Sequence, residues 1–266
     1  MSRRKSYVRI REFGQKRPLQ RVGYISGNQP PTRYTDGMDS LDRPVWASLS
    51  THHVALSVGG ALARRYVPDV NLFASACDDS EAGLAALAGL VRPGEHVFVL
   101  QVPQIVVPSG LTATMSAKGV QMVATRAERA DAADETILKL TEADAPEMLA
   151  LARLTEPGPF LARTNRMGTF LGIRIGERLV AMAGERLRFP GHTEVSGVCT
   201  HPEFRGRGFA RRLSAAVVAG IESRGERPFL HAWKTNLSAN SLYESLGFEV
   251  RAEVDVAVME RGISPA

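Results

Sequence analysis

The chain has 266 residues, 44% hydrophobic and 23% charged, a composition typical of a globular protein with one large or two ordinary domains. It has no apolar stretch of membrane-spanning length and no hydrophobic region after its basic start, so we expect neither a transmembrane helix nor a secretory signal, and a cytoplasmic location. The net charge of +5 comes from residues 1–37, which hold nine Lys or Arg against two Asp or Glu and leave 24 against 26 in the rest.

Residues 1–37 are predicted to form a disordered basic tail, because they combine this charge with Gly and Pro and show little periodicity. The tail is either a polybasic arm that visits RNA or an anionic surface, or an unstructured extension from an upstream start codon. We favour the extension, since a helical pattern begins directly after Met38. Because the rest of the chain is slightly acidic, nucleic acid is not an expected partner.

Residues 38–130 alternate between helical and strand patterns and are predicted to form an α/β half-domain. The expected elements are a helix over 45–66, a strand over 71–76, a helix over 81–91, and strands over 96–102 and 120–125 with a short helix between them. No glycine-rich anion-binding turn occurs in this segment. A charged linker, residues 126–135, follows it.

Residues 136–266 are predicted to form a second α/β domain, opening with a strand over 136–140. Thr141 and Asp144 then have the spacing of a capping box for a helix that is interrupted at Pro157. A hairpin with strands over 170–175 and 178–189 turns at Gly176, and the segment 250–259 supplies closing strands.

The most specific feature is a glycine-rich turn between a strand and a helix. A β-branched strand over 193–200 leads to the turn Arg205-Gly206-Arg207-Gly208-Phe209-Ala210, and an apolar residue then recurs every fourth position to Ile221. Small residues allow close backbone approach, and amides at a helix start attract anions, so this order predicts a pyrophosphate site. It is neither a P-loop, which needs Lys followed by Ser or Thr, nor a dinucleotide motif, because Arg211 replaces the third glycine.

A second motif follows: N-x-x-A-x-x-L-Y-x-x-L-G-F, from Asn236 to Phe248. With the strand ending V-C-T-H-P and the turn R-G-R-G-F-A, it resembles the GNAT superfamily of acetyl-coenzyme A-dependent N-acetyltransferases. The ordered match covers about 194–248, and a looser one reaches back to Ile137. The resemblance implies an α/β (α+β) fold with a mixed central sheet flanked by helices. Residues 38–130 would be a degenerate amino-terminal copy of that fold or an unrelated cap, and 136–266 the transferase domain.

The resemblance implies acetyl-coenzyme A as the co-substrate and no metal. The backbone of Val198, Cys199 and Thr200 would pair with the pantetheine arm, with the Val198 amide facing the thioester oxygen. Asn236 would contact the pantetheine. The pyrophosphate would bind the amides of the turn, and the implied cofactor-binding positions there are Arg205, Gly206, Arg207, Gly208, Phe209, Ala210 and Arg211.

Catalysis needs a base more than an acid, because freeing a lone pair on an amine of pKa about 10.4 costs about 4.6 kcal/mol at pH 7. Glu194 is the candidate base, since it lies eleven residues before Arg205, as in the histone-acetylating branch. The alternatives are a solvated Glu194, water, or Glu185, which could instead pair with Arg186 or Arg188. Tyr243 is the candidate acid near the sulfur, or a packing residue.

Cys199 lies in an apolar strand, which favours a buried thiol and direct transfer over a covalent acyl-enzyme. The six histidines lack metal-ligand spacing. The sequence therefore predicts an N-acetyltransferase acting on a small-molecule or peptide amine. The alternative is a non-catalytic acyl-coenzyme A-binding or regulatory protein. The acceptor, the acyl chain preference and the oligomeric state, including a homodimer, stay open.

Overall fold

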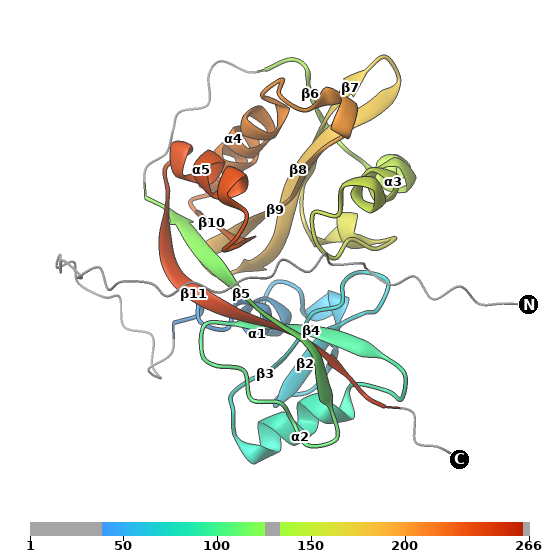
Figure 1. Cartoon of the computed structure of the whole chain (residues 1–266), viewed down its shortest axis with the longest axis vertical. Helices are drawn as coiled ribbons and strands as arrows, with labels where there is room; N and C mark the ends of the chain where they lie inside the picture. The colour runs from blue at the N-terminus through green and yellow to red at the C-terminus, as the bar shows by residue number, and fades with distance from the viewer. Residues whose placement is uncertain (1–38, 126–133, 263–266) are drawn as a thin grey trace, which may run out of the picture. The chain divides into compact units, whose positions relative to one another are not determined.

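The computed structural model describes residues 39–125 and 134–262 (Figure 1). The predicted tail, residues 1–37, and most of the predicted linker lie outside these residues. The described residues all belong to one compact unit, and the description below concerns that unit.

A central sheet of eight strands forms the framework, and nine helical segments and a smaller sheet pack around it in the described part of the chain. Its strands are β4 (His96–Gln101), β5 (Thr112–Ala124), β6 (Ile137–Lys139), β7 (Phe170–Ile175), β8 (Arg178–Phe189), β9 (His192–Thr200), β10 (Arg227–Trp233) and β11 (Phe248–Glu260). The strand order is β4-β11-β5-β10-β9-β8-β7-β6. Only β9 and β10 pair in parallel among these neighbours, so the sheet is mixed, as predicted.

The amino-terminal part also builds a separate three-stranded antiparallel sheet. The sheet consists of β1 (Ser57–Gly59), β2 (Ala63–Tyr66) and β3 (Ala74–Ala76), and the helical segments of this part are α1 (Pro44–Ser50), η1 (Val54–Leu56) and α2 (Glu81–Gly89). The helix predicted over 45–66 is wrong beyond Ser50. Gly59 has φ of 125°, and a Cβ there would lie 2.3 Å from the Ala63 carbonyl oxygen, so glycine turns the chain into the β1–β2 hairpin.

Strand β5 lies between β10 and β11, although it precedes both by about a hundred residues. It pairs antiparallel with each of them, and it occupies the stretch for which a short helix was predicted. Segments 38–130 and 136–266 therefore share one sheet. The predicted boundary between the two segments therefore does not coincide with an edge of the central sheet.

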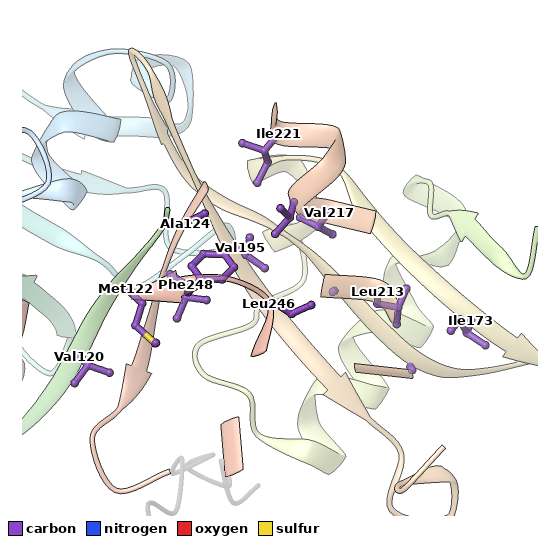
Figure 2. Packing of buried hydrophobic residues seen from close by; sticks show 14 of the residues in the cluster. Val120, Met122, Ala124, Ile173, Val195, Leu213, Val217, Ile221, Leu246 and Phe248 are labelled. Atoms are coloured by element: carbon purple, nitrogen blue, oxygen red, sulfur yellow. The ribbon is translucent and has the colours of Figure 1, made fainter. Parts of the chain in front are cut away.

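Helices from the carboxy-terminal part cover both faces of strands β7 to β9. The helical segments of this part are η2 (Glu142–Asp144), α3 (Ala145–Thr155), η3 (Thr164–Met167), η4 (Pro202–Phe204), α4 (Phe209–Glu222) and α5 (Leu237–Ser245). Of these, α3 and α4 cover β7 to β9, and α5 packs against β11. The predicted capping box is confirmed, since Thr141 and Asp144 bond reciprocally ahead of α3. On the face opposite α3, Leu213, Val217 and Ile221 of α4 pack with β5 and β9 side chains (Figure 2).

Candidate functional site

Strands β9 and β10 separate in the middle of the sheet. Their parallel pairing covers only His192–Glu194 against Arg227–Phe229, after which β9 continues along β8 and β10 along β5. In β9, two residues, Gly197 and Val198, then lie opposite the single residue Ala183, because Ser196 pairs with Gly184 and Cys199 with Met182. Gly197 has φ of 63°. This bulge takes the backbone of Val198 out of the regular ladder at the position predicted for the thioester.

The glycine-rich turn forms an open amino terminus for α4. Gly206 and Gly208 have φ of 78° and 74°, Gly208 is the N-cap, and no side chain caps the helix. Among the described residues, no hydrogen bond is made by the amides of residues 206–210. A Cβ at either glycine would meet no atom within 4 Å, so the described residues do not cover the turn at these two positions. Such amides, with the helix dipole behind them, are suited to bind phosphate.

Two further features of this corner fit a phosphorylated ligand. Oγ1 of Thr200, at the end of β9, is buried without a hydrogen-bond partner. Arg205 and Arg207 are exposed beside the turn, Arg207 stacking on the Phe204 ring at 5.0 Å. Arg211 instead donates from Nη1 to Ser245 Oγ at 2.6 Å, which directs it toward α5. The residues present therefore fit the diphosphate and pantetheine of coenzyme A.

Helix α5 carries the two remaining predicted contacts. Asn236 caps it, with Oδ1 accepting from the Ala239 amide at 3.2 Å, so this oxygen is used within the helix. Tyr243 is half-buried and packs edge-on against Phe248. Burial raises the pKa of the Tyr243 phenol to about 12, although the nearby Arg186 charge acts against this shift. Tyr243 is therefore protonated at neutral pH and can act as a hydrogen-bond donor.

Glu194 is fully buried, and each of its oxygens accepts two hydrogen bonds. Oε1 accepts from Nη2 of Arg186 at 2.6 Å and from Nδ1 of His231 at 2.6 Å. Oε2 accepts from Nε of Arg186 at 2.7 Å and from the Leu187 amide at 3.2 Å. Burial alone would raise the pKa of Glu194, but Arg186 and His231 together lower it to about 2.

Gln121 of β5 determines which nitrogen of His231 carries the proton. Nε2 of Gln121 donates to the Leu41 carbonyl at 2.8 Å, and its Oε1 accepts from Arg251 at 2.9 Å, which fixes the amide orientation. The same Nε2 lies 3.1 Å from Nε2 of His231, which must therefore accept. Nδ1 of His231 then holds the hydrogen that is donated to Glu194.

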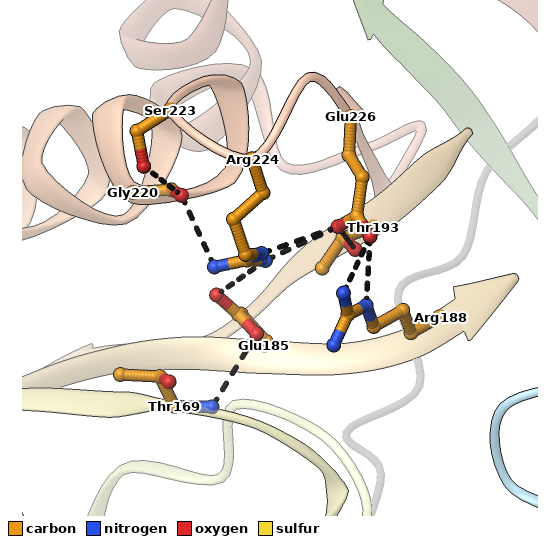
Figure 3. Close-up of polar contacts among 8 residues, drawn as sticks. All are labelled: Thr169, Glu185, Arg188, Thr193, Gly220, Ser223, Arg224 and Glu226. Carbon is orange, nitrogen blue, oxygen red and sulfur yellow. Dashed lines mark hydrogen bonds and ion pairs between the residues drawn. The ribbon is translucent and has the colours of Figure 1, made fainter. Parts of the chain in front are cut away.

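Glu185, the alternative base, is also in an ion pair. It is 5% exposed and lies 3.0 Å from Nη2 of Arg224, and it accepts a long hydrogen bond from the Thr169 amide at 3.4 Å (Figure 3). Its partner is thus Arg224 of the turn after α4. The pairing considered for Glu185 with Arg186 or Arg188 does not occur, because Arg186 pairs with Glu194 and Arg188 with Glu226.

A small pocket, with an enclosed volume of about 10 Å³, lies beside the β9 bulge. Its walls combine a proline-rich loop with aromatic rings and the buried Arg186. The lining residues are Pro157, Gly158, Pro159, Phe160, Thr164, Phe170, Arg186, Ser196 and Gly197. The sequence predicted the interruption at Pro157 but did not identify Arg186 as a site residue. The signal for it was weak: two opposite charges eight residues apart around a hairpin.

The amino-terminal segment holds this loop in place. Arg163 donates from its amide to the Asp69 carbonyl at 2.9 Å and forms an ion pair with the Asp69 carboxylate. Thr164 donates from Oγ1 to the Val70 carbonyl at 2.6 Å. The loop that lines the pocket is therefore fixed by residues far away in sequence.

Cys199 is buried, and burial raises the pKa of its thiol to about 11, which does not suit a nucleophile. Within residues 39–125 and 134–262, no group of three or more His, Cys, Asp or Glu is arranged to hold a metal ion. None of the helices in the described part is long and apolar enough to cross a bilayer.

Comparison with known proteins is consistent with this geometry. The FR47-like protein family matches residues 170–256. A GNAT-family protein from Novosphingobium aromaticivorans DSM 12444 is 43% identical, with a TM-score of 0.79 over 85% of this chain and 100% of its own. A GCN5-related N-acetyltransferase from Kribbella flavida shares the fold at 16% identity, with a TM-score of 0.54 over 84% of this chain and 96% of its own. No curated protein matches the chain in sequence. The chain belongs to the GNAT family of acetyltransferases.

Proposed function

We propose that the chain is an N-acetyltransferase that transfers an acetyl group from acetyl-coenzyme A directly to a primary amine of a small molecule or peptide. The observation that carries this proposal is the open amino terminus of α4, with its unbonded amides, next to the point where β9 and β10 separate. The co-substrate supplies an activated thioester. Amides of residues 206–210 would hold its diphosphate, and the backbone of residues 198–200 its pantetheine arm.

Tyr243 would donate a hydrogen bond to the sulfur as negative charge develops there. With a pKa of about 12 it keeps its proton at neutral pH, whereas a free thiol ionises near 8.5. The phenol therefore supports the leaving thiolate by hydrogen bonding, and complete proton transfer to the sulfur is not required.

Glu194 receives a different role in this proposal from the one the sequence suggested. A carboxylate with a pKa of about 2, whose oxygens already accept four hydrogen bonds, is a weak base with no free lone pair in reach of a substrate. We infer that Glu194 positions Arg186, and that water takes the proton that the acceptor ammonium group must lose before its nitrogen attacks the thioester carbonyl.

A thiol-release screen over pooled amines with acetyl- and longer acyl-coenzyme A tests the function. We expect amine-dependent release. If calorimetry shows that acetyl-coenzyme A binds at millimolar concentration, and the screen finds no amine that is acetylated, the non-catalytic alternative is favoured. Absence of binding, or hydrolysis of the thioester without amine dependence, would contradict the transferase assignment.

A further inference from the structure

Arg186 has one edge of its guanidinium group left over for a ligand. The Nε and Nη2 edge is bound by Glu194, and one face stacks on the Phe73 ring at 4.9 Å. Nη1 makes no hydrogen bond within the described residues, and a Cβ on Gly158 would lie 3.9 Å from it. Since Gly158 and Arg186 both line the pocket beside the β9 bulge, the unused donors face that pocket.

The guanidinium group is rigid as well as unsatisfied. Arg186 is only 9% exposed, and Glu194 and Phe73 together fix its position and orientation. A donor held in place before a ligand arrives loses little conformational entropy on binding, so its hydrogen bond is strong and selective. Besides Arg186, the polar residues of the pocket wall are Thr164 and Ser196, and Thr164 already donates to the Val70 carbonyl.

Charge and shape of the pocket indicate the class of ligand. Glu194 neutralises Arg186, so the pocket suits a molecule with no net charge rather than a polyamine. Phe160, Phe170 and two prolines supply apolar walls, and the enclosed space of about 10 Å³ is far below that of a closed ligand pocket, so a ligand would reach Arg186 from the open side. An α-amino acid carries its ammonium and carboxylate close together, has no net charge, and can present an oxygen to Arg186 with its nitrogen at the bulge.

We propose that Arg186 determines acceptor specificity by binding the α-carboxylate, or the equivalent carbonyl oxygen, of an amino acid with an apolar side chain. This inference rests on the proposed function, because it places the acceptor amine beside the Val198 backbone. Glu194 acts through Arg186 as a positioning residue. The same oxygen occurs in a free amino acid and at a peptide amino terminus, and the experiment distinguishes these two sources.

The test compares pairs of acceptors that differ only in the presence of the α-carboxylate. Acetyl transfer is measured with L-alanine against ethylamine and L-phenylalanine against phenethylamine, with alaninamide and an alanyl tripeptide as additional arms. We expect kcat/KM at least tenfold higher for the amino acid of each pair. A higher rate with the tripeptide than with alanine identifies a peptide amino terminus as the source of the oxygen.

Two variants locate the effect. Arg186→Lys keeps the positive charge next to Glu194 but lacks Nη1, so the amino acid preference should fall to within about threefold of unity, mainly through KM. Arg188→Lys, two residues along the same strand and outside the pocket, should keep the preference. Equal rates for amino acid and amine in the wild-type protein would overturn the proposal and leave the transferase function intact.

A binding measurement separates the two proposals. If no amine releases thiol, the transferase function fails. The melting temperature of the full chain is then measured with millimolar L-phenylalanine or phenethylamine. Stabilisation by the amino acid alone, lost in Arg186→Lys, supports the site, and equal shifts refute it.

Discussion

Replacement of Glu194 by Gln tests whether this residue holds Arg186 or acts as the catalytic base. Each oxygen of Glu194 accepts from two donors, so the new NH₂ group faces two donors in either orientation of the amide. The change also leaves the buried Arg186 charge without its counter-ion. Breaking a buried pair in this way costs about 3–5 kcal/mol.

The pKa of Glu194 gives an independent magnitude. A carboxyl group held at about 2 rather than at its usual 4.5 contributes about 3 kcal/mol to stability at neutral pH. Because the folded-state pKa is the lower one, this contribution is complete above about pH 4.5 and disappears as the pH falls toward 2. The stability difference between wild type and Glu194→Gln should therefore be largest near neutrality and shrink on acidification over that range.

Urea unfolding followed by tryptophan fluorescence measures the loss, with an unchanged m-value as evidence that the folded state is retained. Glu185→Gln is the control, since its partner Arg224 is 31% exposed and the loss should be smaller. The double variant Arg186→Met, Glu194→Leu should recover most of the stability. The opposite result would show that Glu194 is the base: Glu194→Gln would lower the free energy of unfolding by less than 1 kcal/mol. It would also lower turnover a hundredfold and remove the acidic limb of the pH profile of turnover.

Three further results are expected. Tyr243→Phe should lower turnover at least tenfold and leave acetyl-coenzyme A binding nearly intact in calorimetry, and unchanged turnover would remove Tyr243 from the mechanism. Gly208→Ala should weaken acetyl-coenzyme A binding at least tenfold, because the new Cβ would enter the predicted phosphate site. Gly225→Ala is the control: Gly225 has the same φ of 74° and the same open space around a Cβ, so the backbone strain is equal but binding should be unchanged. Cys199→Ala should retain turnover within about threefold, and complete inactivation would instead indicate an acyl-enzyme.

The segment around the glycine-rich turn was predictable because its signals are local. A β-branched strand, two glycines and a four-residue apolar repeat each depend on neighbours in sequence, and they define β9, the turn and α4 as observed. The helix over 45–66 failed for the opposite reason. Its apolar spacing fits a helix, but Gly59 and pairing with β3 across the small sheet favour strands.

The contacts of Glu194 could not be predicted, because they depend on register. Its pairing with Arg186 requires the bulged β8–β9 hairpin, in which the ladder shifts between Glu185 and Arg188. Its contact with His231 requires the parallel pairing of β9 with β10. A spacing of eleven residues to the turn identifies the strand position but not the partners of the side chain.

The position of β5 explains why the amino-terminal segment belongs to the site. Gln121 pairs with His231 in the β5–β10 ladder and fixes its tautomer, and His231 then donates to Glu194, which holds Arg186. The same segment holds the pocket loop through Asp69 and stacks Phe73 on the guanidinium group. Apart from the Glu194 carboxylate, the groups that hold Arg186 and its pocket in place thus depend on Asp69, Phe73 and Gln121, which all precede position 125. A chain reduced to residues 136–266 would keep the glycine-rich turn but lose β5, the strand between β11 and β10, and the groups that orient Arg186. The amino-terminal segment would thus be part of the proposed acceptor site.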